Sequence, residues 1–393
     1  MSFPDSTSSA RPINLLTLTP FYPSVQDTAS GCFIAEPSAW LEKSGVKNTI
    51  FAVQPAYRGR RKATGTAPSA EWISYLTPPG SLGLAVSGAF VYARILSAVR
   101  RLHRSSAIDL IHAHAPLPCG HAAALLSQEL GIPFVVSVHG LDVFSSANFG
   151  GCATHWNRRV SEMVYQKARR TICVSQRVCD EIFTGMGTRC RASVVYNGVD
   201  PTLFSPGQDS GACDTTILSV GNLIPTKGHE LLLRALAALK RSVAGLSCII
   251  IGDGPERTRL QQAARELGIS DRTTFAGRQS RASVAGFLRR SAIFCLPSSY
   301  EGLGCVYLEA MAAGKPAVGC LGQGIAEIIQ HNVNGCLVDP GNLDGLVTTV
   351  AKLMEDSTAA RRIASAGRST VLNGFTLSHQ AQRLNHIYRE CLA

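Results

Sequence analysis

A short segment, ILSVGNLIPTKG, combines three features that favour an anionic ligand. An apolar run ends at Gly221, a helical pattern begins near Gly228, and Lys227 immediately precedes that helix. Glycine lets the backbone approach a ligand closely, the free amides at a helix start attract an anion, and a lysine adds a positive point charge. The segment therefore suits a phosphate group, although an ordinary surface lysine in a loop gives the same pattern.

Two glutamates, Glu301 and Glu309, stand eight residues apart in the segment SSYEGLGCVYLEAMAAGKP. Between them Gly302, Leu303 and Gly304 predict a turn into a helix that begins near Gly304. The amides of this turn can bind a diphosphate, and Glu309 can accept hydrogen bonds from vicinal hydroxyls such as those of a ribose. Glu301 is placed to contact a sugar ring. The alternative is a glutamate that favours the helix dipole beside a surface glutamate.

Two further candidates follow predicted strands. His139 stands at the carboxyl end of the apolar run 133–138, where a histidine can face a ligand instead of the core. Gly31 lies in a long loop after the first predicted strand, immediately ahead of an amphipathic helix at 33–44, and could bring that loop to the same ligand. A lone histidine is more often a satisfied core group, so His139 is a candidate by its position only.

The elements that must position these residues form two successive α/β patterns. Apolar runs rich in Val and Ile, typical of a parallel sheet covered on both faces, alternate with helical patterns. In the first pattern we expect strands at 13–18, 48–53, 109–114, 133–138, 170–175 and 192–197, and helices at 33–44, 84–104, 119–130, 157–169 and 176–184. After a linker at 197–214, the second has strands at 215–221, 246–252, 273–277, 292–297, 316–320 and 336–339, and helices at 228–242, 255–267, 281–290, 304–313, 324–330, 343–354 and 378–393.

This alternation predicts two open, doubly wound parallel sheets that face each other across a cleft. We expect a flexible tail at 1–10, an N-terminal domain at 11–200, a C-terminal domain at 201–372 and a C-terminal helical segment at 373–393. In open α/β sheets, ligands bind beyond the carboxyl ends of the strands, so the candidate residues should meet in that cleft.

Composition narrows the class of protein. The 393 residues are 45% hydrophobic and 17% charged, which excludes a mainly disordered chain. A net charge of +11 fits an anionic ligand or membrane surface, but no Lys/Arg block of the nucleic-acid-binding kind is present. The 13 scattered cysteines indicate small buried hydrophobes in a reducing compartment, and the N-terminus lacks a signal-peptide pattern. We expect a cytoplasmic protein, either soluble or attached to a membrane from one side.

Membrane contact has one candidate element. The uncharged stretches 72–93 and 110–128 contain prolines, so neither is expected to span a membrane. The helix expected at 84–104 is amphipathic and carries four arginines. Such a helix can bind anionic lipid at the inner face of the plasma membrane, or it can simply pack on its own sheet; the sequence favours packing and leaves both open.

Three absent motifs limit the ligand chemistry. The sequence has no Asp-x-Asp pair for a metal-bound nucleotide sugar, no G-x-G-x-x-G after the first strand and no G-x-x-x-x-G-K-[ST]. Its cysteines and histidines form no cluster at zinc spacing. We therefore expect no metal ion and no bound cofactor.

The ordered motifs resemble those of the retaining glycosyltransferases of family 4, which have the GT-B fold of two Rossmann-like domains and a C-terminal helix that crosses back to the first. The resemblance covers nearly the whole chain and is strongest from about residue 135 to 340. The pair Glu301 and Glu309 is its best marker. The other matching strings are SVHGLDVF, CVSQRVCDEI, VVYNGVDPTLFSP, ILSVGNLIPTKGHELLLRAL, IIIGDGPERTRL and GIAEII.

This resemblance implies a role for each candidate. Lys227 would bind the donor diphosphate and Glu309 the ribose hydroxyls. Glu301 and the amides after Gly302 would hold the donor sugar and phosphate. His139 would contact the transferred sugar near the reacting centre.

Four residues complete the implied donor site. The loops of Gly31 and Gly221 would lie near the donor phosphates, and Arg278 would lie where the chain passes the nucleotide base. Many family members have an arginine in place of Asn222, and that arginine shares the diphosphate with the lysine. The substitution puts donor affinity in question, not the fold, and it resembles branches that build bacterial cell-surface polysaccharides.

The implied reaction is transfer of a hexosyl group from a nucleotide diphosphate sugar to a hydroxyl, with retention of configuration. A UDP-sugar is the first expectation and a GDP-sugar the second. The acceptor can be a lipid-linked saccharide or a small soluble molecule. Other readings are an epimerase or hydrolase of nucleotide sugars on the same fold, a non-catalytic nucleotide-sugar sensor, and a nicotinamide-dependent oxidoreductase, which the missing glycine fingerprint argues against.

Overall fold

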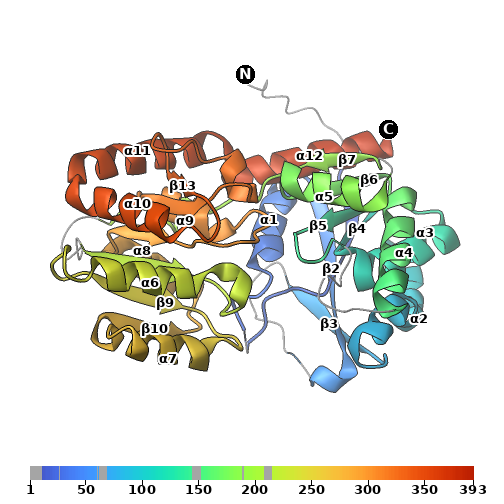
Figure 1. Cartoon of the computed structure of the whole chain (residues 1–393). Helices are drawn as coiled ribbons and strands as arrows, with labels where there is room; N and C mark the ends of the chain where they lie inside the picture. The colour runs from blue at the N-terminus through green and yellow to red at the C-terminus, as the bar shows by residue number, and fades with distance from the viewer. Residues whose placement is uncertain are drawn as a thin grey trace.

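The computed structural model describes residues 11–25, 27–59, 61, 69–143, 152–187, 190–207 and 215–393. These residues form two lobes, each built on a parallel sheet with helices on both faces (Figure 1). The predicted α/β class of two doubly wound sheets is confirmed. The flexible tail expected at 1–10 lies outside the described residues.

The first sheet has seven strands in the order β3-β2-β1-β4-β5-β6-β7. They are β1 (Ile13–Thr19), β2 (Val46–Pro55), β3 (Ala70–Tyr75), β4 (Leu110–His114), β5 (Phe134–Val138), β6 (Arg170–Cys173) and β7 (Ala192–Val194). Because neighbouring residues of a strand point to opposite faces, Leu15 packs with helices α1 (Cys32–Lys43) and α12 (Leu377–Leu392), and Leu16 packs on the other side. The remaining helices are α2 (Gly80–Ser105), α3 (His121–Leu130), α4 (Cys152–Lys167) and α5 (Gln176–Met186).

The second sheet has six strands in the order β10-β9-β8-β11-β12-β13. They are β8 (Thr216–Val220), β9 (Ser247–Ile251), β10 (Thr273–Gly277), β11 (Ile293–Cys295), β12 (Ala317–Cys320) and β13 (Cys336–Val338). The helices are α6 (His229–Leu239), α7 (Arg257–Glu266), α8 (Arg281–Arg290), α9 (Cys305–Ala312), α10 (Leu343–Glu355) and α11 (Ser357–Gly374). Strand residues Cys248 and Cys295 are buried, as their apolar surroundings in the sequence predict.

Some elements differ from the sequence-based expectation. Strand β3 and helix α11 are not anticipated, because β3 is an edge strand with only half of its residues buried and α11 is rich in Ser, Thr, Arg and Gly. The helix expected at 324–330 is only a short 3-10 turn, Gly324–Glu327. Its isoleucines have helical spacing, but they pack as a buried turn. The strand expected at 192–197 ends at Val194.

The C-terminal helix returns to the first lobe, as the resemblance implied. Val199 and Thr376 form a parallel bridge, and the backbone N–H of Gly198 donates to Oε1 of Gln380 at 2.8 Å. Helix α12 then packs along α1 (Figure 1). This crossing brings residues near the end of the chain beside the first sheet.

Helix α2 packs on its own sheet. Val91, Ile95 and Val99 form a buried stripe that packs in the first lobe's core, whereas Phe90 is 42% exposed. Within the described part of the chain, Gly83–Ser105 is the one helical segment long and apolar enough to cross a membrane by length and composition, and 39% of it is buried inside the protein. The uncharged stretches noted in the sequence each divide between a strand and a helix.

Candidate active site

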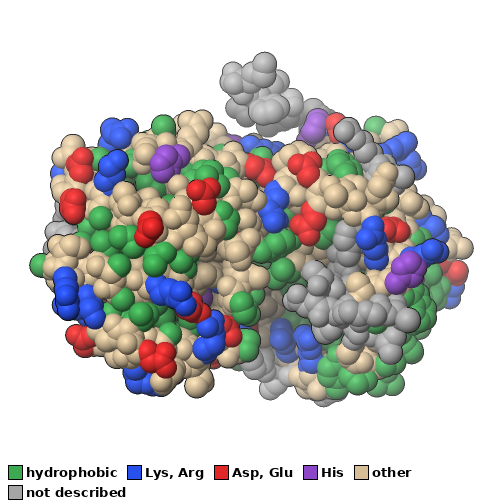
Figure 2. Space-filling model, in the orientation of Figure 1, with side chains coloured by type: hydrophobic (Ala, Val, Ile, Leu, Met, Phe, Trp, Pro, Cys, Tyr) green, Lys and Arg blue, Asp and Glu red, His purple; other side chains and the backbone are tan. Residues whose placement is uncertain are grey.

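Residues that follow strands β1, β5, β8 and β11 line a cleft between the lobes. Two adjoining cavities of about 590 and 340 Å³ occupy this cleft. Figure 2 shows basic side chains at its lower opening. Leu303 is buried in the core. All other candidates from the sequence line one cavity or both: Gly31, His139, Gly221, Asn222, Lys227, Arg278, Glu301, Gly302, Gly304 and Glu309.

Lys227 and Glu301 form an ion pair at this edge of the second sheet. Nζ of Lys227 donates to Oε2 of Glu301, and the two side chains are 15% and 14% exposed. Lys227 ends a 3-10 turn after β8, and Glu301 stands in the loop after β11. Because β8 and β11 are neighbours in the sheet, their loops meet. An anionic ligand would have to share the ammonium group with the carboxylate.

The turn from Gly302 to Gly304 touches the opposite lobe. Oγ of Ser175 donates to the carbonyl oxygen of Gly302 at 2.6 Å, and a Cβ on Gly302 would lie 2.2 Å from the carbonyl oxygen of His139. Gly304 has φ +82° and precedes the first residue of α9, which confirms the predicted helix start. Only glycine adopts this conformation easily, and it opens the α9 amides toward the 340 Å³ cavity.

Glu309 belongs to a three-residue ionic cluster that joins the lobes. The Arg281 guanidinium binds Glu309 and also donates from Nε and Nη2 to the Glu36 carboxylate at 2.7 and 2.9 Å. Burial opposes the charged form of Arg281, but the carboxylates outweigh burial and raise the pKa of the guanidinium. The carboxylate predicted to bind ribose is therefore already held by a cation, on a helix that lines the cavity.

A second ion pair between the lobes is more exposed. Nη1 of Arg278 binds Oδ2 of Asp27 at 2.6 Å, and the Arg278 side chain is 60% exposed. An exposed pair of this kind contributes little to stability, so Arg278 can turn toward a ligand at small cost.

Glycines shape two loops of the cleft. Gly31 has φ +73° at the N-terminus of α1, and a Cβ there would lie 2.5 Å from the backbone of Phe21. Gly221 donates its N–H to Ile251 at 2.9 Å and is followed by Asn222, which lines both cavities. These two positions leave the loop backbones close to the space between the lobes.

His139 borders the larger cavity and also a small internal one. Its ring lies 4.7 Å from the ring of Phe33, and its backbone N–H donates to Oδ1 of Asp142 at 2.8 Å. Nε2 of His139 is 3.1 Å from Nδ1 of His114. Burial lowers the pKa of His139 to about 3, so its imidazole is neutral at neutral pH.

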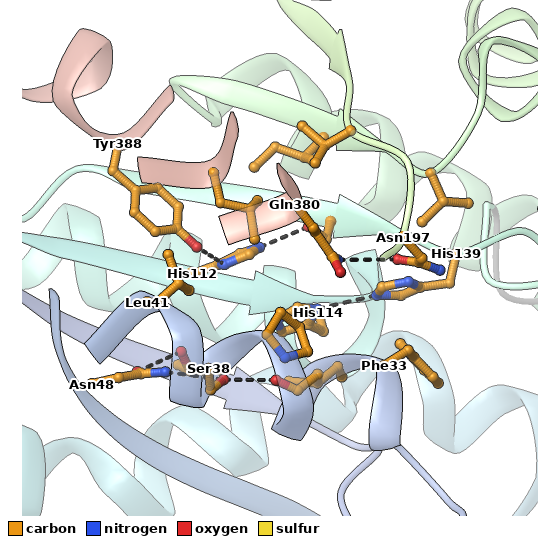
Figure 3. A pocket seen from close by; sticks show the side chains of 18 residues that line it. Phe33, Ser38, Leu41, Asn48, His112, His114, His139, Asn197, Gln380 and Tyr388 are labelled. Carbon is orange, nitrogen blue, oxygen red and sulfur yellow. Dashed lines mark hydrogen bonds between the residues drawn. The ribbon is translucent and has the colours of Figure 1, made fainter. Parts of the chain in front are cut away.

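A buried polar group lies behind His139 (Figure 3). His112 bonds through Nδ1 to the hydroxyl of Tyr388 and through Nε2 to Oγ of Ser137, both at 2.7 Å. The ring centroids of His112 and His114 are 4.2 Å apart. The internal cavity among these side chains measures about 20 Å³, which is enough for one water molecule.

Comparison with known proteins identifies the family. A model described as glycosyltransferase family 4 matches residues 34–203, and one described as glycosyl transferases group 1 matches residues 208–370. A sucrose-phosphate synthase from Thermosynechococcus elongatus superposes with a TM-score of 0.80 at 20% identity, covering 97% of this chain and 99% of that one.

The chain is a family 4 glycosyltransferase with the GT-B fold. A glycosyltransferase of this type takes its sugar from a nucleotide-sugar donor. A GDP-mannose-dependent alpha-(1-6)-phosphatidylinositol monomannoside mannosyltransferase of Mycobacterium tuberculosis is 33% identical over 163 residues, which are 40% of this chain and 42% of that protein. HepE of Anabaena, solved with UDP and glucose, superposes with a TM-score of 0.75 at 21% identity over 96% of this chain and all of that one.

Sequence reasoning missed several residues in and behind the cleft of this glycosyltransferase. Arg281 and Glu36 give no motif signal, because only folding brings α8 and α1 together. His112 and His114 do carry a signal, since they alternate along the last residues of a predicted strand. That spacing places both side chains on one face of the sheet at its ligand-binding edge.

The buried histidines predict that the glycosyltransferase loses stability in acid. Burial, then the nearby His139, lowers the pKa of His112 to about 3, against about 6.5 when unfolded. The unfolded chain therefore binds the extra proton between these values, and the free energy of unfolding falls as pH drops below about 6.5, by about 1.4 kcal/mol per pH unit for this histidine.

Denaturant unfolding between pH 7 and pH 4 measures this effect. Burial raises the pKa of Asp142 to about 6, so the folded chain takes up a proton there and gains stability in acid. Because this opposes the effect of the histidines, the pH slope must be compared between variants. His112→Gln should reduce the pH slope by about one proton. His386→Gln is the control for replacing an exposed histidine. Equal slopes in all three proteins would contradict a neutral buried His112.

Loss of Arg281 should destabilise the fold. Arg281→Gln leaves the Glu36 and Glu309 carboxylates without their shared cation, and the guanidinium is only 18% exposed. We expect the free energy of unfolding to fall by about 3 kcal/mol, the lower end for a broken buried ion pair. Arg234→Gln, which breaks the exposed pair with Glu230, should cost less than about 1 kcal/mol. Equal losses would show that the cluster is as weak as a surface pair.

Proposed function

We propose that this glycosyltransferase moves a hexosyl group from a UDP-sugar to a hydroxyl acceptor with retention of configuration, and that it needs no metal ion; a GDP-sugar is the second candidate. The observation that carries the proposal is the convergence of Lys227, Glu301, Glu309 and the α9 amides on one edge of the cleft. HepE binds UDP and the mycobacterial relative depends on GDP-mannose, which supports both nucleotides as candidates.

The electrostatics of the cleft suit this reaction. As the C1–O bond breaks, the leaving diphosphate gains negative charge, and Lys227 with the α9 amides lies beside the space for it. The sugar gains positive charge in an oxocarbenium-like state, which the Glu301 carboxylate can stabilise. The departing phosphate oxygen takes the acceptor proton from the same face. The neutral His139 contacts the transferred sugar and carries no charge in this scheme.

We assign the acceptor to the first lobe and propose a lipid-linked saccharide, met at the inner face of the plasma membrane. Leu76 and Phe90 are 77% and 42% exposed at the β3–α2 end of this lobe. Hydrophobic side chains gather there in Figure 2, and exposed arginines such as Arg94 and Arg101 follow along α2. Apolar side chains beside arginines suit an anionic lipid surface.

Cosedimentation with vesicles containing anionic lipid should fall for Phe90→Asp, and binding equal to that of the wild type would argue against this surface.

A thermal-shift panel tests the donor. It would contain UDP, GDP, ADP, their sugar conjugates and NAD, each at about 100 times the expected dissociation constant, where binding stabilises by about 2.7 kcal/mol. We expect a shift with UDP-sugars that Lys227→Ala abolishes. A shift with NAD alone, or with no sugar nucleotide, would overturn the proposal. The anomeric configuration of the product, read by NMR, then decides retention.

A further inference from the structure

Three histidines from two neighbouring strands form a continuous array that ends in the cleft. His112 and His114 lie on β4, and His139 follows β5. The planes of the His114 and His139 rings differ by only 16°, and their nitrogen atoms are 3.1 Å apart. The ring nitrogens of an imidazole point outward in the ring plane, so this geometry suits a direct N–H···N hydrogen bond between two neutral imidazoles.

The array is held at its far end by the C-terminal helix. Tyr388 of α12 is fully buried, and its hydroxyl bonds to His112 (Figure 3). Gln380, about two turns before Tyr388 in α12, donates from Nε2 to Oδ1 of Asn197 at 3.3 Å. With Ser137 on its other nitrogen, His112 cannot rotate without losing two hydrogen bonds in the buried interior. It therefore provides a fixed surface against which the His114 ring lies.

His139 is incompletely satisfied by the protein. Its Nε2 is taken by His114, while its Nδ1 is buried with no hydrogen-bond partner among the described residues. Buried polar atoms in folded proteins are almost always paired, so an unpaired one needs an explanation. A ligand in the adjoining 590 Å³ cavity, which His139 lines, supplies one.

We propose that His114 is a positioning residue for transfer: it fixes the tautomer and the ring orientation of His139, and Tyr388 holds the array through His112. The inference rests on the proposed function, in which His139 contacts the transferred sugar. Since each neutral imidazole has one N–H and one lone pair, the hydrogen bond couples the tautomers of the two rings: when Nδ1 of His114 donates, Nε2 of His139 accepts and Nδ1 of His139 carries the proton. Because His114 is itself neutral, it can orient His139 without placing a charge in the protein interior.

Kinetics of paired substitutions test the inference. His114→Leu keeps the side chain's bulk but cannot hydrogen bond, whereas His114→Asn places a polar atom near the position of Nδ1. We expect His114→Leu to lower kcat tenfold or more, with the donor KM within twofold of wild type. His114→Asn should have a kcat within about threefold of wild type. His121→Leu, at the start of α3 and outside the cleft, is the control and should keep full activity. Equal losses for Leu and Asn, or no loss, would overturn the inference.

A spectroscopic measurement separates positioning from a general effect on folding. The ¹⁵N chemical shifts of the His139 ring nitrogens report its tautomer and should change in His114→Leu but not in His121→Leu. Tyr388→Phe removes only the hydroxyl on His112 and should lower kcat less than His114→Leu does; an equal or larger loss would assign the effect to the packing of α12. Full activity in His139→Ala would contradict the proposed contact of His139 with the sugar. The ¹⁵N shifts would still test the inference, because an unchanged His139 tautomer in His114→Leu would overturn it.

Discussion

Replacement of Lys227 by alanine should lower turnover at least tenfold and leave the fold intact. Lys227 is the one full positive charge on the loop from Gly221 to Gly228, all of which the structure describes, and position 222 is an asparagine. Removing one preorganised donor from a site of developing negative charge costs about 2.7–4 kcal/mol, or about 10²–10³ in kcat. The measurement is kcat of the variant and of wild type with the donor found in the thermal-shift panel. An unfolding curve of each protein checks that the fold is intact.

Two further variants make the Lys227 result specific. Lys352→Ala removes an exposed lysine from α10 in the same lobe and should keep activity near wild type. Because Lys227 also neutralises Glu301, the double variant Lys227→Ala with Glu301→Gln separates the two tasks. If that variant turned over at the wild-type rate, Lys227 would serve only to neutralise the carboxylate. Near-wild-type rates in both Lys227→Ala and Glu301→Ala would refute the site.

A single methyl group on Gly302 should abolish most activity. Its Cβ would lie 2.2 Å from the carbonyl oxygen of His139 and 3.1 Å from the Cα of Gly140. Both are backbone atoms, so no flexible side chain can yield, and the turn must move away from the first lobe. A displacement of about 1 Å in a reacting site can cost about 10²-fold in rate. We expect a loss of that size in kcat for Gly302→Ala.

Gly286 provides the matched control for Gly302. It lies inside α8, where a Cβ would meet nothing closer than 3.6 Å. Gly286→Ala should therefore keep activity and raise the free energy of unfolding by about 0.5–1 kcal/mol, because alanine loses less backbone entropy in a helix. Should Gly302→Ala turn over at the rate of Gly286→Ala, close contact of the lobes at Gly302 would not be needed for catalysis.

The edge of the cleft that the second lobe forms follows from local sequence. Gly221, Lys227, Glu301 and Gly304 were found without a structure, because each lies within a few residues of a strand end that apolar patterning locates. A parallel sheet gathers such ends at one edge whatever the details of packing. The start of α9 at Gly304 was predictable for the same local reason, since a turn into a helix there requires a residue that tolerates positive φ.

Long-range packing decided the rest of the cleft. Arg281 and Glu36, which form an ion pair, are 245 residues apart in the sequence, and His112 and Tyr388, which share a hydrogen bond, are 276 residues apart. Such partners leave no periodic or spacing signal, because their separation along the chain depends on how α8 and α12 dock. The same is true of α11, whose few buried residues become apolar contacts only when the lobe is complete.

The sequence by itself therefore determined the two α/β lobes, the family and most of the candidate residues that line the cleft. Patterning of period 2 and 3.6 specifies strands and helices, and strand ends specify where ligands bind. Only the tertiary structure decided that Glu309 is already paired with Arg281. It also decided that His139 bonds to His114, which packs on His112, and that His112 bonds to Tyr388 of the last helix. These contacts join side chains from separate elements, and their geometry is fixed by the packing of whole helices and sheets.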